Sequence, residues 1–105
     1  MERGRAEGDH PLSELFNSQE WKSIASHLGL TAQQVRIARL ICLGYTNPEI
    51  AVQIGRAPET VGMHTRGVFQ KLGVHHRVGV PVRLVLVHRR LRRRKMAGGE
   101  REEPT

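Results

Sequence analysis

Apolar residues recur at helical spacing in two neighbouring segments near the middle of the chain, residues 46–54 and 58–72. The apolar face of the first segment comprises Ile50, Ala51 and Ile54, and that of the second comprises Val61, Val68, Phe69 and Leu72. Each segment is polar elsewhere, so the pattern predicts two short amphipathic helices with one buried face each.

Capping and turn residues bound these two helices. Thr46 and Glu49 form the Thr-x-x-Glu pattern of a capping box. Gly55 readily takes the left-handed conformation that ends a helix, and Pro58 suits the first turn of the next one. Helices joined by so short a turn cross steeply, at roughly 90–120° in the helix-turn-helix motif. On these residues alone, an ordinary αα-hairpin is an equally good interpretation.

Two further helices are predicted before this pair. Residues 18–28 place four apolar residues, Trp21 among them, on one face, with Ser18 as the expected cap. Residues 31–43 begin at a second capping box and are apolar on nearly every side. A helix of that kind needs cover on two faces. We therefore expect helix 18–28 to cover the face that the central pair leaves open.

The segment after Gly73 is ambiguous. Its valines favour a strand, but Pro81 disfavours a central strand and the chain offers no partner strand. We predict a helix over about 78–90, whose apolar residues either close the core or contact a second copy. Residues 1–17 and 92–105 are rich in charge and glycine and are predicted to be disordered tails around a helical domain at 18–91.

Charge is segregated along the chain. Residues 30–95 contain thirteen Lys or Arg and two acids, a net charge of +11, whereas the rest carries four bases and eight acids, a net charge of −4. So basic a domain indicates a polyanionic partner, although a solvated charged surface is the alternative. With only four aromatic residues there are too few stacking platforms for single strands, so double-stranded DNA fits better.

Several function classes lack support. No apolar run is long enough to cross a membrane, and the single cysteine, Cys42, fits a reducing, cytoplasmic compartment. No catalytic triad or phosphate-binding glycine loop occurs, so no enzyme and no cofactor is predicted. His64, His75 and His76 match no zinc spacing, and no metal is predicted.

From Leu30 to about Leu86 the chain resembles the DNA-binding domain of LuxR-type (NarL/FixJ-like) bacterial transcription regulators. The matching residues are Leu30, Thr31, Leu40, Gly44, Asn47, Glu49, Ile50, Ala51, Thr60, Val61, His64, Lys71, Leu72, Gly73, Val74 and Arg77. The resemblance implies an all-α fold of four helices over 30–91, preceded here by the extra helix 18–28. The third helix, 58–72, is then the recognition helix and the fourth the usual dimer contact.

The resemblance also implies site residues. Gly62, Met63 and Arg66 match positions that approach bases, and the Arg66 guanidinium suits guanine. The predicted phosphate contacts are Thr46, Asn47, Arg56, Thr60 and Lys71. The predicted dimer contacts are Leu84, Val87, His88 and Leu91.

Three residues depart from the family pattern on the recognition helix. Ala57 replaces the usual capping serine, Gly62 a common lysine, and Gly67 adds a second helix-weakening glycine. The sequence therefore predicts a sequence-specific, dimeric regulator, with two alternatives: a protein-interaction module, or an unspecific basic nucleic-acid binder. No receiver or ligand-binding domain fits before Ser18, so we expect a stand-alone regulator or one that receives its signal from a regulator protein.

Overall fold

The computed structural model describes residues 15–102, with side chains described as far as Lys95. Within this range the chain forms five helices and no strand. They are α2 (Ser18–Leu28), α3 (Ala32–Cys42), α4 (Asn47–Ile54), α5 (Pro58–Leu72) and α6 (Gly79–Glu102). The predicted all-α fold is confirmed, and the valine-rich segment is a helix rather than a strand.

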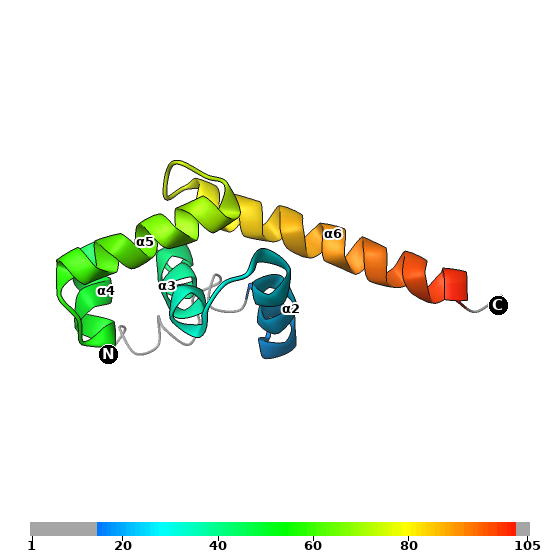
Figure 1. Ribbon diagram of the computed structural model, residues 1–105, viewed down its shortest axis with the longest axis horizontal. Coiled ribbons are helices and arrows are strands. Elements are labelled where there is room, and N and C mark those ends of the chain that lie inside the picture. Colours follow the sequence, from blue (N-terminus) through cyan, green and yellow to red (C-terminus); the bar gives the residue numbers. More distant parts are fainter. Residues whose placement is uncertain (1–14, 103–105) are drawn as a thin grey trace, which may run out of the picture.

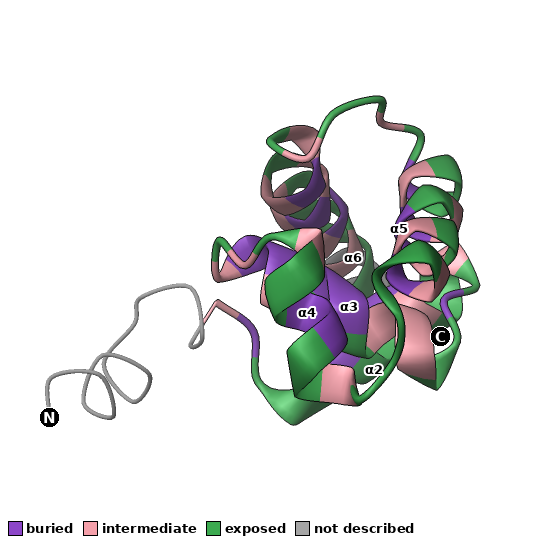
Figure 2. Ribbon diagram, turned by 90° about the vertical axis from the view of Figure 1, so that its left-hand side faces the viewer, coloured by how far each residue is buried: buried purple, intermediate pink, exposed green. Residues whose placement is uncertain are grey.

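Helix α3 lies at the centre of the domain (Figure 1). It packs against α5 and α6, while α4 packs against α5. Figure 2 shows buried residues gathered where α3 meets its neighbours. The inward side chains of α3 are Ile37, Ala38, Ile41 and Cys42. Burial raises the pKa of the Cys42 thiol to about 11, so Cys42 is a neutral core side chain, as its apolar surroundings in the sequence indicate.

The start of α2 differs from the prediction. Asn17, not Ser18, is the N-cap: its Oδ1 accepts the Glu20 N–H at 2.8 Å, and Glu20 Oε1 accepts the Asn17 N–H at 2.8 Å. Phe16 is buried, and its ring meets Trp21 edge-on at 5.2 Å between centroids. A hydrophobic pair at N′ and N4 around a capping box is a hydrophobic staple, and it orders residues that the sequence assigns to the tail.

The partner of α2 also differs. We expect α2 to cover α3, but its main helix contact is with α6, which lies above it in Figure 1. The residues responsible are Phe16, whose ring lies 5.0 Å from that of His88, and Glu20, whose Oε2 lies 3.0 Å from His88 Nε2. Helix α2 still contributes Trp21 and Ile24 to the same buried core as the inward side chains of α3.

Helix α6 continues to Glu102, past Leu91, where the sequence ends the helical domain. Arginine, leucine, lysine, methionine and alanine fill residues 89–97, and each is a good helix former. Extending an existing helix adds one hydrogen bond for each residue fixed, so a charged sequence with good propensity continues the helix that the apolar part nucleates. Residues 1–14 and 103–105 lie outside the described range, and with them most of the predicted N-terminal tail.

Candidate nucleic-acid interface

The turn between α4 and α5 fixes the angle between these two helices. Gly55 ends α4 at φ 69°, a left-handed conformation that favours glycine, and the Arg56 N–H donates to the Ala51 carbonyl at 3.0 Å. Pro58 then begins α5. The bounds of both helices and the capping box at Thr46 are those the sequence predicts.

Helix α5 has one buried and one exposed face. The buried side chains are Val61, Thr65, Val68 and Leu72. The exposed residues on the opposite face are Glu59, Met63, Arg66 and Gln70. Figure 2 shows that α5 has both buried and exposed residues along its length. Met63 is 60% exposed, and Gly62 lies at the edge of this face. The structure therefore places all three predicted base-contacting residues at one accessible surface.

The N-terminal end of α5 is open. Its N-cap, Ala57, makes no side-chain hydrogen bond to the helix, as the sequence predicts from the missing serine. The first amides of a helix lack partners within it, so they favour an anion such as phosphate. A Cβ atom added at Gly62 would meet nothing within 4 Å. The backbone in this first turn and a half can therefore approach a ligand closely.

A polar cluster ties the start of α4 to α5 and to the loop that follows it. Arg77 Nη1 donates to Asn47 Oδ1 at 2.8 Å, and Arg77 Nη2 donates to the Tyr45 carbonyl. The Thr65 hydroxyl donates to the same Asn47 oxygen at 3.4 Å. Burial lowers the pKa of Arg77. The side-chain oxygen of Asn47 is thus engaged inside the protein, whereas the predicted phosphate contact is with the N-terminal backbone amides near Thr46 and Asn47.

Sequence reasoning gives no role to Thr65 or Arg77. Thr65 is a polar residue on the otherwise apolar buried face of α5, four residues after Val61 and three before Val68. That position is the signal that points to it, because a buried hydroxyl needs a partner. Asn47 supplies this partner, so the pair fixes the register between α4 and α5.

Lys71 is a second link within the domain. Its Nζ donates to the Gly29 carbonyl at 2.5 Å and to Gln34 Oε1 at 2.9 Å. The same Gln34 oxygen accepts the Thr31 N–H at 3.0 Å in the capping box of α3. Two of the three ammonium protons of Lys71 therefore hold α5 against the start of α3, and only the third is free for the phosphate contact that the sequence predicts.

Arg56 and Thr60 complete the predicted phosphate set. The Arg56 side chain is exposed in the turn before α5, and Thr60 is half-buried in the first turn of α5. Both lie beside the open N-terminal end of α5. Thr46 is also exposed, although its hydroxyl accepts the Glu49 N–H at 3.3 Å as the cap of α4.

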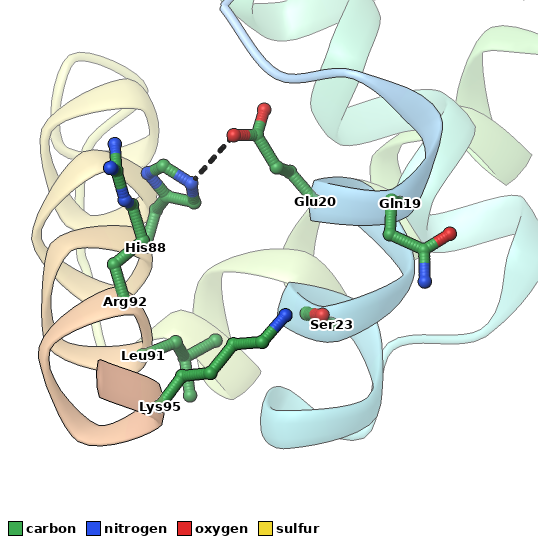
Figure 3. A pocket seen from close by; sticks show the side chains of 7 residues that line it. All are labelled: Gln19, Glu20, Ser23, His88, Leu91, Arg92 and Lys95. Carbon is green, nitrogen blue, oxygen red and sulfur yellow. Dashed lines mark hydrogen bonds and ion pairs between the residues drawn. The ribbon is translucent and has the colours of Figure 1, made fainter. Parts of the chain in front are cut away.

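Two of the four predicted dimer contacts on α6 are buried. Leu84 is 0% and Val87 4% exposed within the single chain, so neither offers surface to a second copy. His88 is in contact with Glu20 at 3.0 Å, and both residues line a cleft of 480 Å³ between α2 and α6, as does Leu91 (Figure 3). Helix α6 carries apolar residues on several sides, and periodicity alone does not tell which of these faces inward.

The exposed apolar residues of α6 lie on another side of the helix. Val78, in the turn before α6, is 75% exposed, and Val82 and Leu86 are 56% and 48% exposed. They follow one another at intervals of four residues and therefore form one stripe. We call this set the α6 stripe. Seven of the residues 83–95 are Lys or Arg, so basic side chains flank and extend the stripe.

The comparisons with known proteins agree on one domain type. A family model described as "Bacterial regulatory proteins, luxR family" matches residues 28–84. Proteins named HTH-type transcriptional regulator MalT, from Cronobacter sakazakii and from two strains of Klebsiella pneumoniae, are 35% identical over 66 residues. The match covers 63% of this chain but only 7% of each relative. No solved structure gave a significant match.

Proposed function

The chain belongs to the luxR family of bacterial regulatory proteins, and on that premise we propose that it binds double-stranded DNA sequence-specifically, with α5 in the major groove. One observation carries the proposal: Met63 and Arg66 project from the exposed face of α5, whose opposite face is buried in the core. A helix held rigidly on one side and bare on the other suits insertion into a groove of about 12 Å.

Each residue of this face has a proposed role. The Arg66 guanidinium donates two hydrogen bonds to O6 and N7 of a guanine, and Met63 contacts a thymine methyl group. Gly62 presents no side chain and lets the backbone come close to the base edges. This is a small base-reading set, so we expect a specificity that depends heavily on Arg66.

Contacts to phosphates position the domain without reading sequence. We propose Thr46 and Asn47 at the start of α4, and Arg56 and Thr60 at the start of α5, for this role. The partial positive charge at both helix N-terminal ends favours phosphate. Lys71 lies at the opposite end of α5 and acts mainly through its bonds to Gly29 and Gln34.

We propose that two copies associate through the α6 stripe rather than through Leu84 and Val87. Exposed apolar residues aligned over two turns of helix are typical of an interaction face. Val82→Glu should then change the DNA complex from two protein chains per site to one, measured by sedimentation. Val52→Glu, at a solitary exposed valine on α4 that is 81% exposed, is the matched control and should keep two chains.

The experiment that tests DNA reading is selection of bound duplexes from a random pool at about 0.15 M salt, where purely ionic binding is suppressed. We expect an enriched motif with two inverted half-sites. Binding without enrichment would support the second candidate function, an unspecific basic binder. The seven cations of residues 83–95 favour that alternative, and deleting residues 89–95 would then remove nearly all affinity.

A chain that binds no DNA at modest salt would instead be a protein-interaction module. We place the protein at the bacterial nucleoid, where its proposed ligand is. No helix in the described range has the length and apolar character needed to span a membrane. The stand-alone arrangement stays a prediction, because the chain corresponds to only 7% of the length of its MalT relatives.

A further inference from the structure

Glu59 places a negative charge on the exposed face of α5. Residues 30–95 contain thirteen Lys or Arg and only two acids, Glu49 and Glu59. The Glu49 carboxylate accepts the Thr46 N–H at 2.8 Å in the capping box of α4. Glu59 is exposed, and within the described part of the chain no hydrogen bond or ion pair engages its carboxylate. Of the two acids, therefore, only Glu49 has a partner in the domain that accounts for it.

Glu59 and Arg66 lie on one line along α5. They are seven residues apart, close to two full turns, so their side chains leave the helix within about 20° of each other. Their separation along the helix axis is about 10 Å at 1.5 Å per residue. Successive base pairs of a duplex are about 3.4 Å apart. A helix that lies along the groove and binds a guanine through Arg66 therefore brings Glu59 to a position about three base pairs away.

The position one turn after Glu59 carries no side chain. A Cβ atom added at Gly62 would meet nothing within 4 Å. Side chains of a helix point toward its N-terminus, so a longer side chain at position 62 would lie over Glu59. Gly62 thus leaves room for the Glu59 carboxylate to extend outward. In helix-turn-helix proteins the N-terminal residues of the recognition helix are those that contact base edges, and Glu59 is the second residue of α5.

The chemistry of a carboxylate restricts the bases that it can contact. An ionised carboxylate only accepts hydrogen bonds. In the major groove guanine and the oxygen of thymine present acceptors, whereas cytosine and adenine present an amino group. Adenine carries the acceptor N7 beside its amino group, and cytosine does not. Phosphates repel a carboxylate, so Glu59 weakens binding to any site where it finds no amino group. This side chain therefore suits selection of cytosine and rejection of guanine and thymine.

We propose that Glu59 is a specificity-determining residue that accepts a hydrogen bond from N4 of a cytosine, about three base pairs from the guanine bound by Arg66. The inference rests on the proposed binding of DNA by α5 and adds a base position to it. The competing role is structural, because the helix dipole favours a negative charge in the first turn of a helix. A structural role predicts less stable Glu59 variants that select an unchanged DNA sequence.

The test is selection of bound duplexes from a random pool at about 0.15 M salt with the full wild-type chain, Glu59→Gln and Glu49→Gln. Glutamine pairs with adenine through N6 and N7. We expect Glu59→Gln to exchange one cytosine of the motif for adenine and to keep the guanine position. Glu49→Gln is the matched control, because Glu49 also lies in the first turn of a helix, and it should select the wild-type motif.

Affinities for defined duplexes give the size of the effect. Replacing the cytosine of the selected site by thymine should weaken binding of the wild type by about tenfold, and binding of Glu59→Ala by less than about twofold. Glu59→Ala should also bind duplexes without the motif more tightly than the wild type does, because it lacks a charge that phosphates repel. Helical content by circular dichroism checks that each variant folds.

The negative results separate this inference from the proposed function. A wild-type chain that enriches no motif would contradict sequence-specific binding, and the role of Glu59 would fall with it. A wild-type chain that enriches a motif which Glu59→Gln selects unchanged would overturn the role of Glu59 alone. An equal gain in affinity of Glu59→Ala for all duplexes would also overturn it, because Glu59 would then only repel phosphates.

Discussion

Two glycines on α5, Gly62 and Gly67, should respond oppositely to replacement by alanine. A Cβ at Gly62 meets nothing within 4 Å, whereas a Cβ at Gly67 would lie 2.8 Å from Gln34 Nε2. Glycine inside a helix is less favourable than alanine by roughly 0.5–1 kcal/mol. Gly62→Ala should therefore raise the free energy of unfolding by about that amount, which corresponds to roughly 4 °C in Tm for a domain of this size.

Gly67→Ala gains the same helix propensity but displaces the Gln34 amide. Side chains this flexible move easily on their own, but Gln34 Oε1 accepts the Thr31 N–H at 3.0 Å and the Lys71 Nζ at 2.9 Å. Losing a helix cap costs about 0.5–2 kcal/mol, and hydrogen bonds at exposed sites lie at the low end of their range. We expect Gly67→Ala to be less stable than Gly62→Ala by about 1–2 kcal/mol.

The assay is chemical denaturation of the wild type, both alanine variants, Gln34→Ala and the Gln34→Ala/Gly67→Ala double variant. With Gln34 already truncated, Gly67→Ala should become stabilising by about 0.5–1 kcal/mol, because the obstacle is gone. Equal stabilisation by Gly62→Ala and Gly67→Ala in the wild-type background would refute the reasoning. It would mean that Gln34 moves aside without losing its bonds.

Three further predictions concern other contacts. Trp21→Ala should lower the free energy of unfolding by about 3–5 kcal/mol, because the ring is buried against Phe16, and an unchanged melting curve would contradict this. The pKa of Glu20 is lowered, first by the hydrogen bond from the Asn17 N–H and then by His88. Its stabilisation is therefore complete above the ordinary glutamate pKa of about 4.3 and is lost as pH falls through the lowered value. Glu20→Gln should therefore reduce the fall in the free energy of unfolding at acid pH. If the pH dependence of the free energy of unfolding is the same in this variant as in the wild type, Glu20 does not contribute to it. Lys71→Met should destabilise the fold yet leave the salt dependence of DNA binding unchanged. If the slope of log affinity against log salt concentration instead becomes smaller by about one unit, Lys71 does contact a phosphate.

The bounds of α4 and α5 could be predicted from the sequence because the residues that start and end each helix lie close to those bounds. Thr46 and Glu49 mark the start of α4, Gly55 its end, and Pro58 the start of α5, and each acts within a few residues of itself. The exposed position of Arg66 follows from the same local logic, since a 3.6-residue period that puts Val61 and Val68 inside must put Arg66 outside.

Contacts between helices that are far apart in the sequence could not be predicted from the sequence alone. The sequence of α2 predicts a helix with one apolar face but does not tell whether α3 or α6 receives it. His88 decides the matter through its ring contact with Phe16 and its 3.0 Å hydrogen bond with Glu20, and these contacts join residues 68 positions apart or more. The burial of Leu84 and Val87 likewise depends on contacts with other helices, and the exposed stripe of α6 lies at Val82 and its neighbours.

The start of α2 at Asn17 does have a local sequence signal, which the prediction of Ser18 as the cap overlooks. Asn17 and Glu20 form a capping box as regular as the one at Thr46, and Phe16 and Trp21 occupy the two positions of a hydrophobic staple. The charged and glycine-rich residues before them masked that pattern. The bonds of Lys71 and Arg77, by contrast, cross between elements far apart in the chain and have no local signature.

The central claim, that the exposed face of α5 reads DNA sequence, is tested most directly by repeating the random-pool selection with Arg66→Ala. The account predicts that one base position in each half-site loses its preference and that affinity for the wild-type motif falls by about 1–3 kcal/mol. Arg56→Ala, the phosphate-contact control, should weaken binding but select the same motif. An Arg66→Ala protein that selects the wild-type motif unchanged would contradict the account.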